Sequence, residues 1–446
     1  MNHGTSGRSV EEETIVEVCG DRAIPPLGVI EQVWDTDPIP VTDIETTAAT
    51  AVDGLALDSV PDGGTVAIGV GSRGVANLPA IVRGTVEGVR ERGYEPFLFP
   101  AMGSHGGATP EGQREVLDAL GVSEETVNCE VRATMDVERI GVTPDREVPV
   151  FTDAEAATAD AIVPINRIKP HTMFAGNVES GLSKMLVIGM GKQRGAKTAH
   201  EWALDWSFRN MIPEITTLLI DRLPIVGGIA IVEDQRDDTA IIEGVPASGF
   251  LDRESELLET AYDLLPTLPF DDLDVVVFDR MGKDVSGAGM DTNVTGRLLP
   301  FNEPEPENPF IRRIYVRSLT EASGGNATGV GQADFIHRDL FADIDVRKTV
   351  INTVTSGSVE NARTPATVET DRAGMLASVS TVGIRQPETI RILRATDTMD
   401  LERLYASEAL LEEARSREDL RVVSEPEPVE FSDGDLVAPS PTRLVE

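Results

Sequence analysis

The sequence predicts an α/β protein built from two domains with mostly parallel sheets. Short apolar segments alternate along the chain with longer amphipathic segments, which is the pattern of strands followed by helices. The 446 residues exceed the size at which one hydrophobic core usually stops growing, about 250–300 residues. Because alternating strands and helices form parallel sheets covered on both faces, we expect two such domains of about 200 residues each.

Composition divides the chain into four segments. Residues 1–12 (MNHGTSGRSVEE) contain no apolar run and are predicted to be disordered. Residues 13–266 are expected to form the first α/β domain and residues 267–424 the second, because the proline-spaced acidic stretch PTLPFDDLD marks a boundary near residue 267. Residues 425–446 are rich in proline and acid, so we expect an acidic tail.

In the first domain, β-branched and aromatic runs predict strands, and apolar residues at helical spacing predict helices. Strands are expected at residues 14–19, 65–70, 95–100, 160–166 and 224–232, and helices at residues 46–57, 78–92, 109–120, 203–223 and 252–265. Gly93 closes the helix at 78–92, and Thr109 followed by Pro110 is typical of a helix start.

The second domain continues the same alternation. Strands are expected at residues 275–279, 311–316 and 389–393, and helices at residues 338–343, 368–379 and 401–415. This domain therefore belongs to the same structural class as the first.

The chain carries a strong excess of acid, with 76 acidic against 39 basic residues and a formal charge of -37. We expect no affinity for nucleic acid or anionic membrane, because both need a basic surface. Acid spread along the whole length, with very little lysine, suggests a soluble surface adapted to high salt, as in halophilic proteins. The start of the chain shows no signal segment and the longest apolar run, near residues 223–232, is too short to cross a bilayer, so we expect a cytoplasmic protein.

The segment from residue 167 to 200, RIKPHTMFAGNVESGLSKMLVIGMGKQRGAKTAH, collects the residues best suited to chemistry. Lysine offers a compact charge and an amine that can be deprotonated and bonded covalently, which arginine does not. Only six of the 39 basic residues are lysine, yet four of them lie in this segment: Lys169, Lys184, Lys192 and Lys197. His171 and His200, two of the five histidines, lie there as well. The segment is therefore predicted to hold an active site.

Four loops follow predicted strands and would meet at the carboxyl ends of parallel sheets, where α/β proteins bind ligands. They hold Arg73, His105, the segment 171–200, and Lys283 with Asp291. GVGSRG around Arg73 matches a dinucleotide fingerprint, but no acidic residue ends the next strand, so an anion-binding loop or a plain turn is favoured. GKQRGAKT at residues 191–198 is either a solvated helix face or an anion site.

Taken together, these motifs resemble the nickel-pincer-nucleotide-dependent lactate racemases and their relatives. The resemblance covers residues 60–205 well and the second domain more loosely. The family has an arginine loop, a histidine loop, a P-H segment with F-A-G, a small-residue S-G-x-x-K turn and a downstream histidine. The matching segments here are SRG, AMGSHGG, KPHTMFAG, ESGLSK and AKTAH. Their shared order and spacing are more specific than any one motif.

The resemblance implies roles for the proton-transferring and substrate-binding residues. His105 and His171 would act as acid and base on opposite faces of the substrate. Arg73 would hold the substrate carboxylate, because a guanidinium fork suits a carboxylate. A lysine of the second domain would assist it, and this residue is Lys283 or, alternatively, Lys348.

The resemblance also implies a cofactor site in the first domain, which would then be the catalytic one. Lys184, in a turn with Ser180 and Gly181, would carry pyridinium-3-thioamide-5-thiocarboxylic acid mononucleotide, bonded as a thioamide. Sulfur and carbon atoms of this group hold nickel, and His200 would be the metal ligand supplied by the protein. Sulfur and imidazole are ligands that suit nickel.

The implied reaction is racemisation or epimerisation of a small-molecule 2-hydroxy acid. A histidine takes the hydroxyl proton while hydride moves from C2 to the pyridinium, and both return on the other face of the planar 2-oxo acid. The active site is implied to lie in the cleft between the two domains, which would exclude water from the intermediate. The implied protein partners are cofactor-biosynthesis proteins, and a homo-oligomer stays open.

Two other readings of the same residues remain open. A zinc hydrolase or lyase could use His105, His171 and His200 as ligands. Glu179 and Glu201 are the nearby carboxylates that could act as its hydrolytic base, and metal analysis would distinguish this reading. A non-catalytic sensor could hold an anion with Arg73, Lys192 and Arg194, and ligand binding without turnover would favour it.

Overall fold

The computed structural model describes residues 9–20, 22–72, 74–297, 305–437 and 441, and the chain divides into two compact units. The central unit is Thr36–Leu265, and the terminal unit combines Met1–Asp35 with Pro266–Glu446. Each unit is an α/β structure with a mostly parallel sheet, so the predicted fold class is confirmed. Each unit is described by itself.

The central unit contains a five-stranded sheet in the order β3-β2-β6-β7-β8. Its strands are β2 (Thr65–Val70), β3 (Glu95–Pro100), β6 (Ala161–Arg167), β7 (Gly227–Glu233) and β8 (Thr239–Pro246). The first four run parallel, and β8 returns antiparallel to β7. The strands predicted at 65–70 and 95–100 match β2 and β3 to the residue. The edge strand β8 was not predicted from the sequence.

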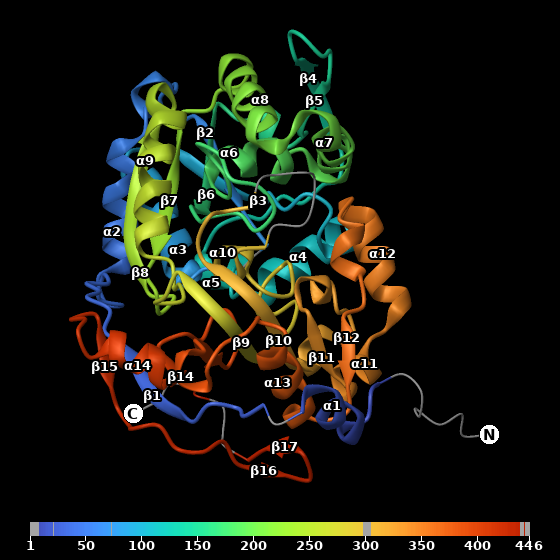
Figure 1. Cartoon of the computed structure of the whole chain (residues 1–446). Helices are drawn as coiled ribbons and strands as arrows, with labels where there is room; N and C mark the ends of the chain where they lie inside the picture. The colour runs from blue at the N-terminus through green and yellow to red at the C-terminus, as the bar shows by residue number, and fades with distance from the viewer. Residues whose placement is uncertain (1–8, 21, 73, 298–304, 438–440, 442–446) are drawn as a thin grey trace. The chain divides into compact units, whose positions relative to one another are not determined.

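Helices cover both faces of this sheet, as expected for parallel strands (Figure 1). One face packs against α2 (Ile44–Ala51), α3 (Leu78–Glu91) and α4 (Pro110–Ala119). The other packs against α7 (Lys192–Trp206), α8 (Phe208–Arg222) and α9 (Phe250–Asp263). Thr109 caps α4 as predicted, because its side chain accepts a hydrogen bond from the Gly112 N–H.

The long helix predicted at residues 203–223 is two helices in the structure. Ser207 has φ of 65°, a left-handed conformation that ends α7, and its side chain accepts a hydrogen bond from the Arg209 N–H at the start of α8. The apolar periodicity continues through this break, which is why the sequence pattern joins the two helices.

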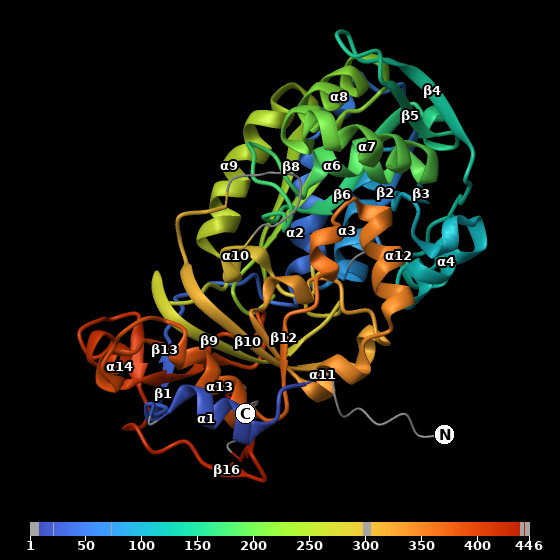
Figure 2. The same cartoon turned by 45° about the vertical axis from the view of Figure 1, so that its right-hand side comes forward.

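The terminal unit contains an eight-stranded sheet in the order β12-β11-β10-β9-β13-β14-β1-β15 (Figure 2). The five parallel strands are β9 (Asp272–Met281), β10 (Phe310–Leu319), β11 (Phe335–His337), β12 (Ala366–Val368) and β13 (Ile392–Ala395). Three antiparallel strands extend one side: β14 (Arg403–Ser407), β1 (Leu27–Gln32) and β15 (Leu420–Val422). The helices of this unit include α1 (Glu12–Cys19), α11 (Arg338–Asp343), α12 (Val346–Ser356), α13 (Asp371–Ser380) and α14 (Glu408–Ala414).

The start of the chain belongs to the terminal unit, so the expectation that residues 13–35 join the first domain is wrong. The reason is strand pairing, since β1 lies between β14 and β15 in the terminal sheet. Residues 14–19, expected to form a strand, lie in the helix α1. The predicted boundary near residue 267 agrees with the division at Leu265 and Pro266.

Two further predictions for this unit differ from the structure. Residues 401–415, expected to form one helix, contain the strand β14 followed by α14. The expected acidic tail contains the short hairpin of β16 (Phe431–Ser432) and β17 (Asp435–Leu436). The disorder predicted for residues 1–12 concerns mostly residues 1–8, which lie outside the described part, whereas Glu12 begins α1.

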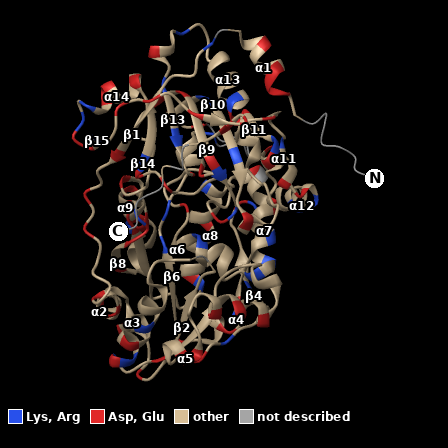
Figure 3. Cartoon of the chain, turned by 90° about the horizontal axis from the view of Figure 1, so that it is seen from below, with Lys and Arg blue, Asp and Glu red and all other residues tan. Residues whose placement is uncertain are grey.

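Acidic residues are distributed over elements of both units and are interleaved with fewer basic ones (Figure 3). Among the described residues, no helix combines the length and apolar character needed for a membrane span.

A buried ion pair joins α7 to the strand β5 (Pro149–Asp153), which lies outside the central sheet. The Lys192 and Asp153 side chains are both fully buried, and Lys192 Nζ lies 2.8 Å from Asp153 Oδ2. Lys192 Nζ also donates to the Pro100 carbonyl at 2.5 Å and to Gln113 Oε1 at 2.9 Å. Gln113 in turn donates through Nε2 to the Gly103 carbonyl at 3.0 Å. Lys192 therefore supports the loop that carries His105. Burial lowers the pKa of Lys192, and the negative charge of Asp153 partly offsets this shift.

Replacing Lys192 by methionine should destabilise the central unit by about 3–5 kcal/mol, because removing one partner leaves Asp153 buried without its cation. The measurement is denaturant unfolding followed by the fluorescence of Trp202 and Trp206. The matched control is Lys197→Met, which removes an exposed lysine 3.7 Å from Glu201 and should cost less than about 1 kcal/mol. Equal losses in the two variants would contradict the anchoring role.

Candidate functional site

The loops after β2, β3 and β6 leave the same edge of the central sheet, because these strands are parallel neighbours. The loops after β2 and β3 touch through Ser72 and His105, since Ser72 Oγ and His105 Nδ1 share a short hydrogen bond. His105 is exposed. Arg73, the predicted substrate-binding residue, lies outside the described residues.

Glu233, at the end of β7, secures the loop after β2. Its carboxylate accepts a 2.6 Å hydrogen bond from the Ala76 N–H and forms an ion pair with Arg167 at the end of β6. This buried carboxylate therefore joins the ends of β6 and β7 to the backbone of the loop after β2.

His171 lies in a loop whose two ends are hydrogen-bonded to each other. Lys169 and Ser180 exchange two backbone hydrogen bonds, of 2.8 and 3.2 Å, and so close the loop 169–180 at its base. The His171 Nδ1 accepts a hydrogen bond from the Met173 N–H at 3.1 Å. In the neutral ring this contact leaves the proton on Nε2, which is the nitrogen that can donate to a substrate oxygen.

Glu179 fills the inside of this loop. The residue is 1% exposed, and its carboxylate accepts hydrogen bonds from the His171 N–H at 2.6 Å, the Gly176 N–H at 2.9 Å and the Tyr262 hydroxyl at 2.9 Å. Burial raises the pKa of Glu179, while these donors and the charge of Lys184 oppose the shift. The sequence suggested Glu179 only as a hydrolytic base in the zinc reading, whereas here its carboxylate holds the backbone of the loop.

Lys184 lies in the turn that follows the loop. The turn consists of the short helix α6 (Leu182–Lys184) and a π-helical segment, Met185–Gly189, before α7 begins. Such segments interrupt α-helices most often at functional sites. Lys184 Nζ donates to Ser180 Oγ at 3.4 Å, so two of the three predicted cofactor residues are in contact.

Gly181 is the third predicted cofactor residue, and only glycine fits here because the Glu254 carboxylate lies close to its Cα. A Cβ atom at this position would lie 2.0 Å from Glu254 Oε1. The Glu254 carboxylate accepts hydrogen bonds from the Ser183 N–H, at 3.0 Å to Oε2, and from the Ser183 hydroxyl, at 2.5 Å. Asn166 holds the other side, because its Nδ2 donates to the Gly181 carbonyl at 2.7 Å. Complete burial raises the pKa of Glu254 to about 7, against these donors.

His200 lies within α7, six residues before its last residue Trp206. A histidine at a helix C-terminus would be favoured as imidazolium by the helix dipole, but here the helix continues past His200. The His200 side chain is exposed, yet desolvation by the surrounding protein lowers its pKa, and the charge of Lys184 adds to the effect. A neutral imidazole is the form that can bind a metal.

A column of four aromatic rings joins the two histidines of the segment. The ring of His171 lies 4.6 Å from that of Phe174, Phe174 lies 5.5 Å from Phe208, and Phe208 meets His200 edge-on at 5.3 Å, measured between centroids. Phe174 and Phe208 are buried. The two phenyl rings therefore set the separation between the imidazoles.

Lys283 and Lys348 belong to the terminal unit, where each has local partners. Lys283 follows β9, donates through Nζ to the Gly287 carbonyl, and its N–H donates to Ser323 Oγ at 2.8 Å. Lys348 is exposed on α12 and donates to the Gly324 carbonyl at 2.6 Å. The choice between them stays a prediction, as does a site in the cleft between the two domains.

The two rival readings find less support. Lys192 is buried in its ion pair and is therefore not arranged to hold an anion. Arg194 is exposed and lies over the ring of Phe151 at 4.5 Å. A zinc site would need imidazole nitrogens of His105, His171 and His200 close enough to bind one ion. Within the described part of the chain, the one group of three such residues with ligand atoms within 4.8 Å of one another is His337, Asp371 and Asp435, which includes none of the predicted histidines.

That group is arranged as a hydrogen-bonded network. His337 Nδ1 accepts from the Asp339 N–H at 3.1 Å, so the neutral ring carries its proton on Nε2, which faces Asp435 Oδ1 at 3.2 Å. Asp371 accepts from the Tyr315 hydroxyl at 2.7 Å and from Arg317 at 2.7 Å. Both ring nitrogens of His337 are engaged in hydrogen bonds, so neither offers a lone pair to a metal ion. The positive charge of Arg317 would also repel the ion. The network instead fixes the β16–β17 hairpin.

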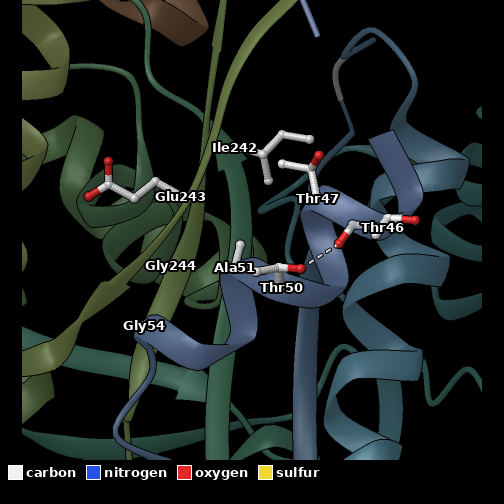
Figure 4. Close-up of a pocket in the computed structure, with 8 residues that line it drawn as sticks. All are labelled: Thr46, Thr47, Thr50, Ala51, Gly54, Ile242, Glu243 and Gly244. Atoms are coloured by element: carbon white, nitrogen blue, oxygen red, sulfur yellow. Dashed lines mark hydrogen bonds between the residues drawn. The ribbon is translucent and has the colours of Figure 1, made fainter. Parts of the chain in front are cut away.

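A surface cavity of about 410 Å³ lies between α2 and β8 (Figure 4). Its one carboxylate, Glu243, forms a 2.7 Å ion pair with Arg253. The residues that line the cavity are Thr46, Thr47, Thr50, Ala51, Gly54, Ile242, Glu243 and Gly244. None of the predicted site residues is among them, and nothing there matches the chemistry of the β2, β3 and β6 loops.

Replacing Glu254 by glutamine should flatten the pH dependence of the stability of the central unit between pH 4.5 and about 7. The folded protein keeps the Glu254 proton up to about pH 7, whereas the unfolded chain loses it near 4.5, so this group makes stability fall as pH rises through that window. The slope it contributes is at most about 1.4 kcal/mol per pH unit. Unfolding curves of both proteins at several pH values test this, and identical slopes would contradict it.

Comparisons with known proteins give a family match over part of the chain and weak similarity to solved structures. Residues 70–245 match the family described as a domain of unknown function, DUF362. No curated protein matches the chain. A crystal structure of a Thermotoga maritima protein is similar, with 14% identity, coverage of 81% of this chain and 89% of that chain, and a TM-score of 0.45. The lactate racemase apoprotein from Thermoanaerobacterium thermosaccharolyticum has 11% identity, coverage of 83% and 88%, and a TM-score of 0.45.

Proposed function

We propose that this protein is an isomerase that racemises or epimerises a small 2-hydroxy acid. The observation that carries the proposal is the grouping at the carboxyl edge of the central sheet. Lys184 contacts Ser180, its charge acts on both Glu179 and His200, and His171 lies in the adjoining loop. His105 enters from the loop after β3, two strands from the end of β6.

The residues present fit a tethered nickel-pincer nucleotide. Lys184 is a half-buried amine next to a hydroxyl, and Gly181 and Ser180 form the small-residue turn beside it. His200 is accessible and favours its neutral form, as a metal ligand must. When bound, the cofactor would supply a pyridinium ring that accepts a hydride from C2 of the substrate and returns it.

The side chains of this protein would manage the proton and the carboxylate. His105 and His171 would exchange the hydroxyl proton of the substrate, and their separate loops suit them to opposite faces. The Ser72 hydroxyl orients the ring of His105 by its contact with Nδ1. Arg73 and Lys283 would hold the substrate carboxylate through charge-assisted hydrogen bonds.

A base acting directly on C2 is a less suitable mechanism for these residues. It would form a carbanion beside an ionised carboxylate, and such an intermediate needs a dedicated cluster of donors for its oxygens. Hydride transfer avoids this charge, because the electrons leave with the hydrogen. Histidine then handles a hydroxyl proton, for which its pKa range is suited.

The fate of hydrogen on C2 tests the proposed function. Protein purified from its native host is incubated with one enantiomer of a 2-hydroxy acid, beginning with lactate, deuterated at C2 in ordinary water. The expected product is the opposite enantiomer with the deuterium retained, because the hydride does not exchange with solvent. Chiral chromatography with mass detection measures both quantities.

The matched control is the Lys184→Arg protein prepared in the same way, which should show no interconversion because guanidinium forms no thioamide. Loss of the C2 label to water at the rate of epimerisation would overturn the hydride mechanism. No interconversion of any 2-hydroxy acid by the natively produced protein would overturn the proposed function itself.

A further inference from the structure

One buried side chain, that of Glu179, bonds the backbone of the loop 169–180 on both sides. Ala175 and Asn177 are exposed, and the backbone bridge between Lys169 and Ser180 closes the loop only at its base. Glu179 lies inside and reaches the backbone at both sides, through the His171 N–H on Oε2 and the Gly176 N–H on Oε1. A carboxylate that accepts two amide hydrogens in this way fixes the distance between them.

Tyr262 connects this carboxylate to the rest of the unit. Its hydroxyl donates to Glu179 Oε1 at 2.9 Å, and Tyr262 belongs to α9, which packs in the same core as the sheet. The loop is therefore tied through Glu179 to a helix more than 80 residues away along the chain. The same loop inserts the buried Phe174 between His171 and Phe208.

We propose that Glu179 is a positioning residue that fixes the ring of His171, and through Phe174 its separation from His200. The carboxylate holds the His171 backbone directly, and it keeps the loop in the shape that seats Phe174 in the aromatic column. The role of His171 in proton transfer rests on the proposed function, whereas the placing of its ring by Glu179 does not.

Glutamine is the most informative replacement, because it keeps the shape of the side chain. An amide offers one acceptor oxygen where the carboxylate offers two, so its nitrogen would face either the His171 N–H or the Gly176 and Tyr262 donors. Losing one charge-assisted hydrogen bond of this kind should speed local opening by about tenfold or more. The effect should be confined to the loop and the rings that contact it.

The test uses two readouts on the full-length protein, neither of which needs cofactor or substrate. Hydrogen exchange with mass detection follows the peptide containing 169–180, and NMR of carbon-labelled histidine follows the rings, since the chain has only five histidines. In Glu179→Gln, exchange in 169–180 should rise by about tenfold or more, and the His171 signal should shift, while that of His337 in the terminal unit stays unchanged.

Glu254→Gln is the matched control, because it changes an equally buried glutamate of the same unit that holds Ser183 rather than the loop. It should leave the His171 signal in place. Tyr262→Phe serves if Glu179→Gln does not fold, and it should shift the His171 signal in a folded protein. An unmoved His171 signal with unchanged exchange in 169–180 would overturn the positioning role. Altered readouts in a protein that interconverts no hydroxy acid would overturn only the proposed function.

Discussion

The parallel alignment of β3, β2, β6 and β7 is the constraint on which the candidate site depends, because it places the loops after these strands at one edge of one sheet. The loops after β2, β3 and β6 are held there by buried ionisable groups bonded to their backbones. These groups are Glu233 at the Ala76 N–H, Lys192 at the Pro100 carbonyl, Glu179 at the His171 N–H and Glu254 at the Ser183 N–H. Burying them carries a desolvation cost, which their hydrogen bonds offset only while the loops keep this arrangement. The result is a set of ordered loops around residues that differ in charge and exposure.

The sequence predicts the parts of the fold whose local pattern and long-range pairing agree. β2 and β3 are short β-branched or aromatic runs, and both match the prediction to the residue. Residues 14–19 look like a strand by composition, but Ile15 and Cys19, four residues apart, pack on one side of a helix. The strand β14 was hidden in an apparent helix, because its structure comes from pairing with β1 and β13, which are distant in sequence. Local periodicity does not contain such pairings.

At the site, too, the sequence indicates residues in local motifs but not the contacts between residues that are distant along the chain. Scarce lysine and histidine at motif spacing point to Lys184, His171 and His200, which the structure brings into one neighbourhood. Glu254 carried an overlooked signal, since it falls on the apolar stripe of α9 with Leu257 and Leu258, where a carboxylate must have a buried partner. The contact of Glu179 with the loop backbone had no such signal, because its partners come from a loop and from Tyr262 in a distant helix. Lys192 was read as a surface or anion-binding cation, and only the structure shows its pairing with Asp153.

The proposed function requires a covalent nickel-bearing group on Lys184, and the intact mass of natively produced protein tests this most directly. We expect a mass above that of the sequence by several hundred units, on the order of a modified mononucleotide. Peptide mapping should place the added mass on Lys184, with about one nickel ion per chain by metal analysis. Lys184→Arg should have the mass of its sequence alone. An unmodified Lys184 in protein that interconverts 2-hydroxy acids would show that the reaction needs no covalent group on this lysine.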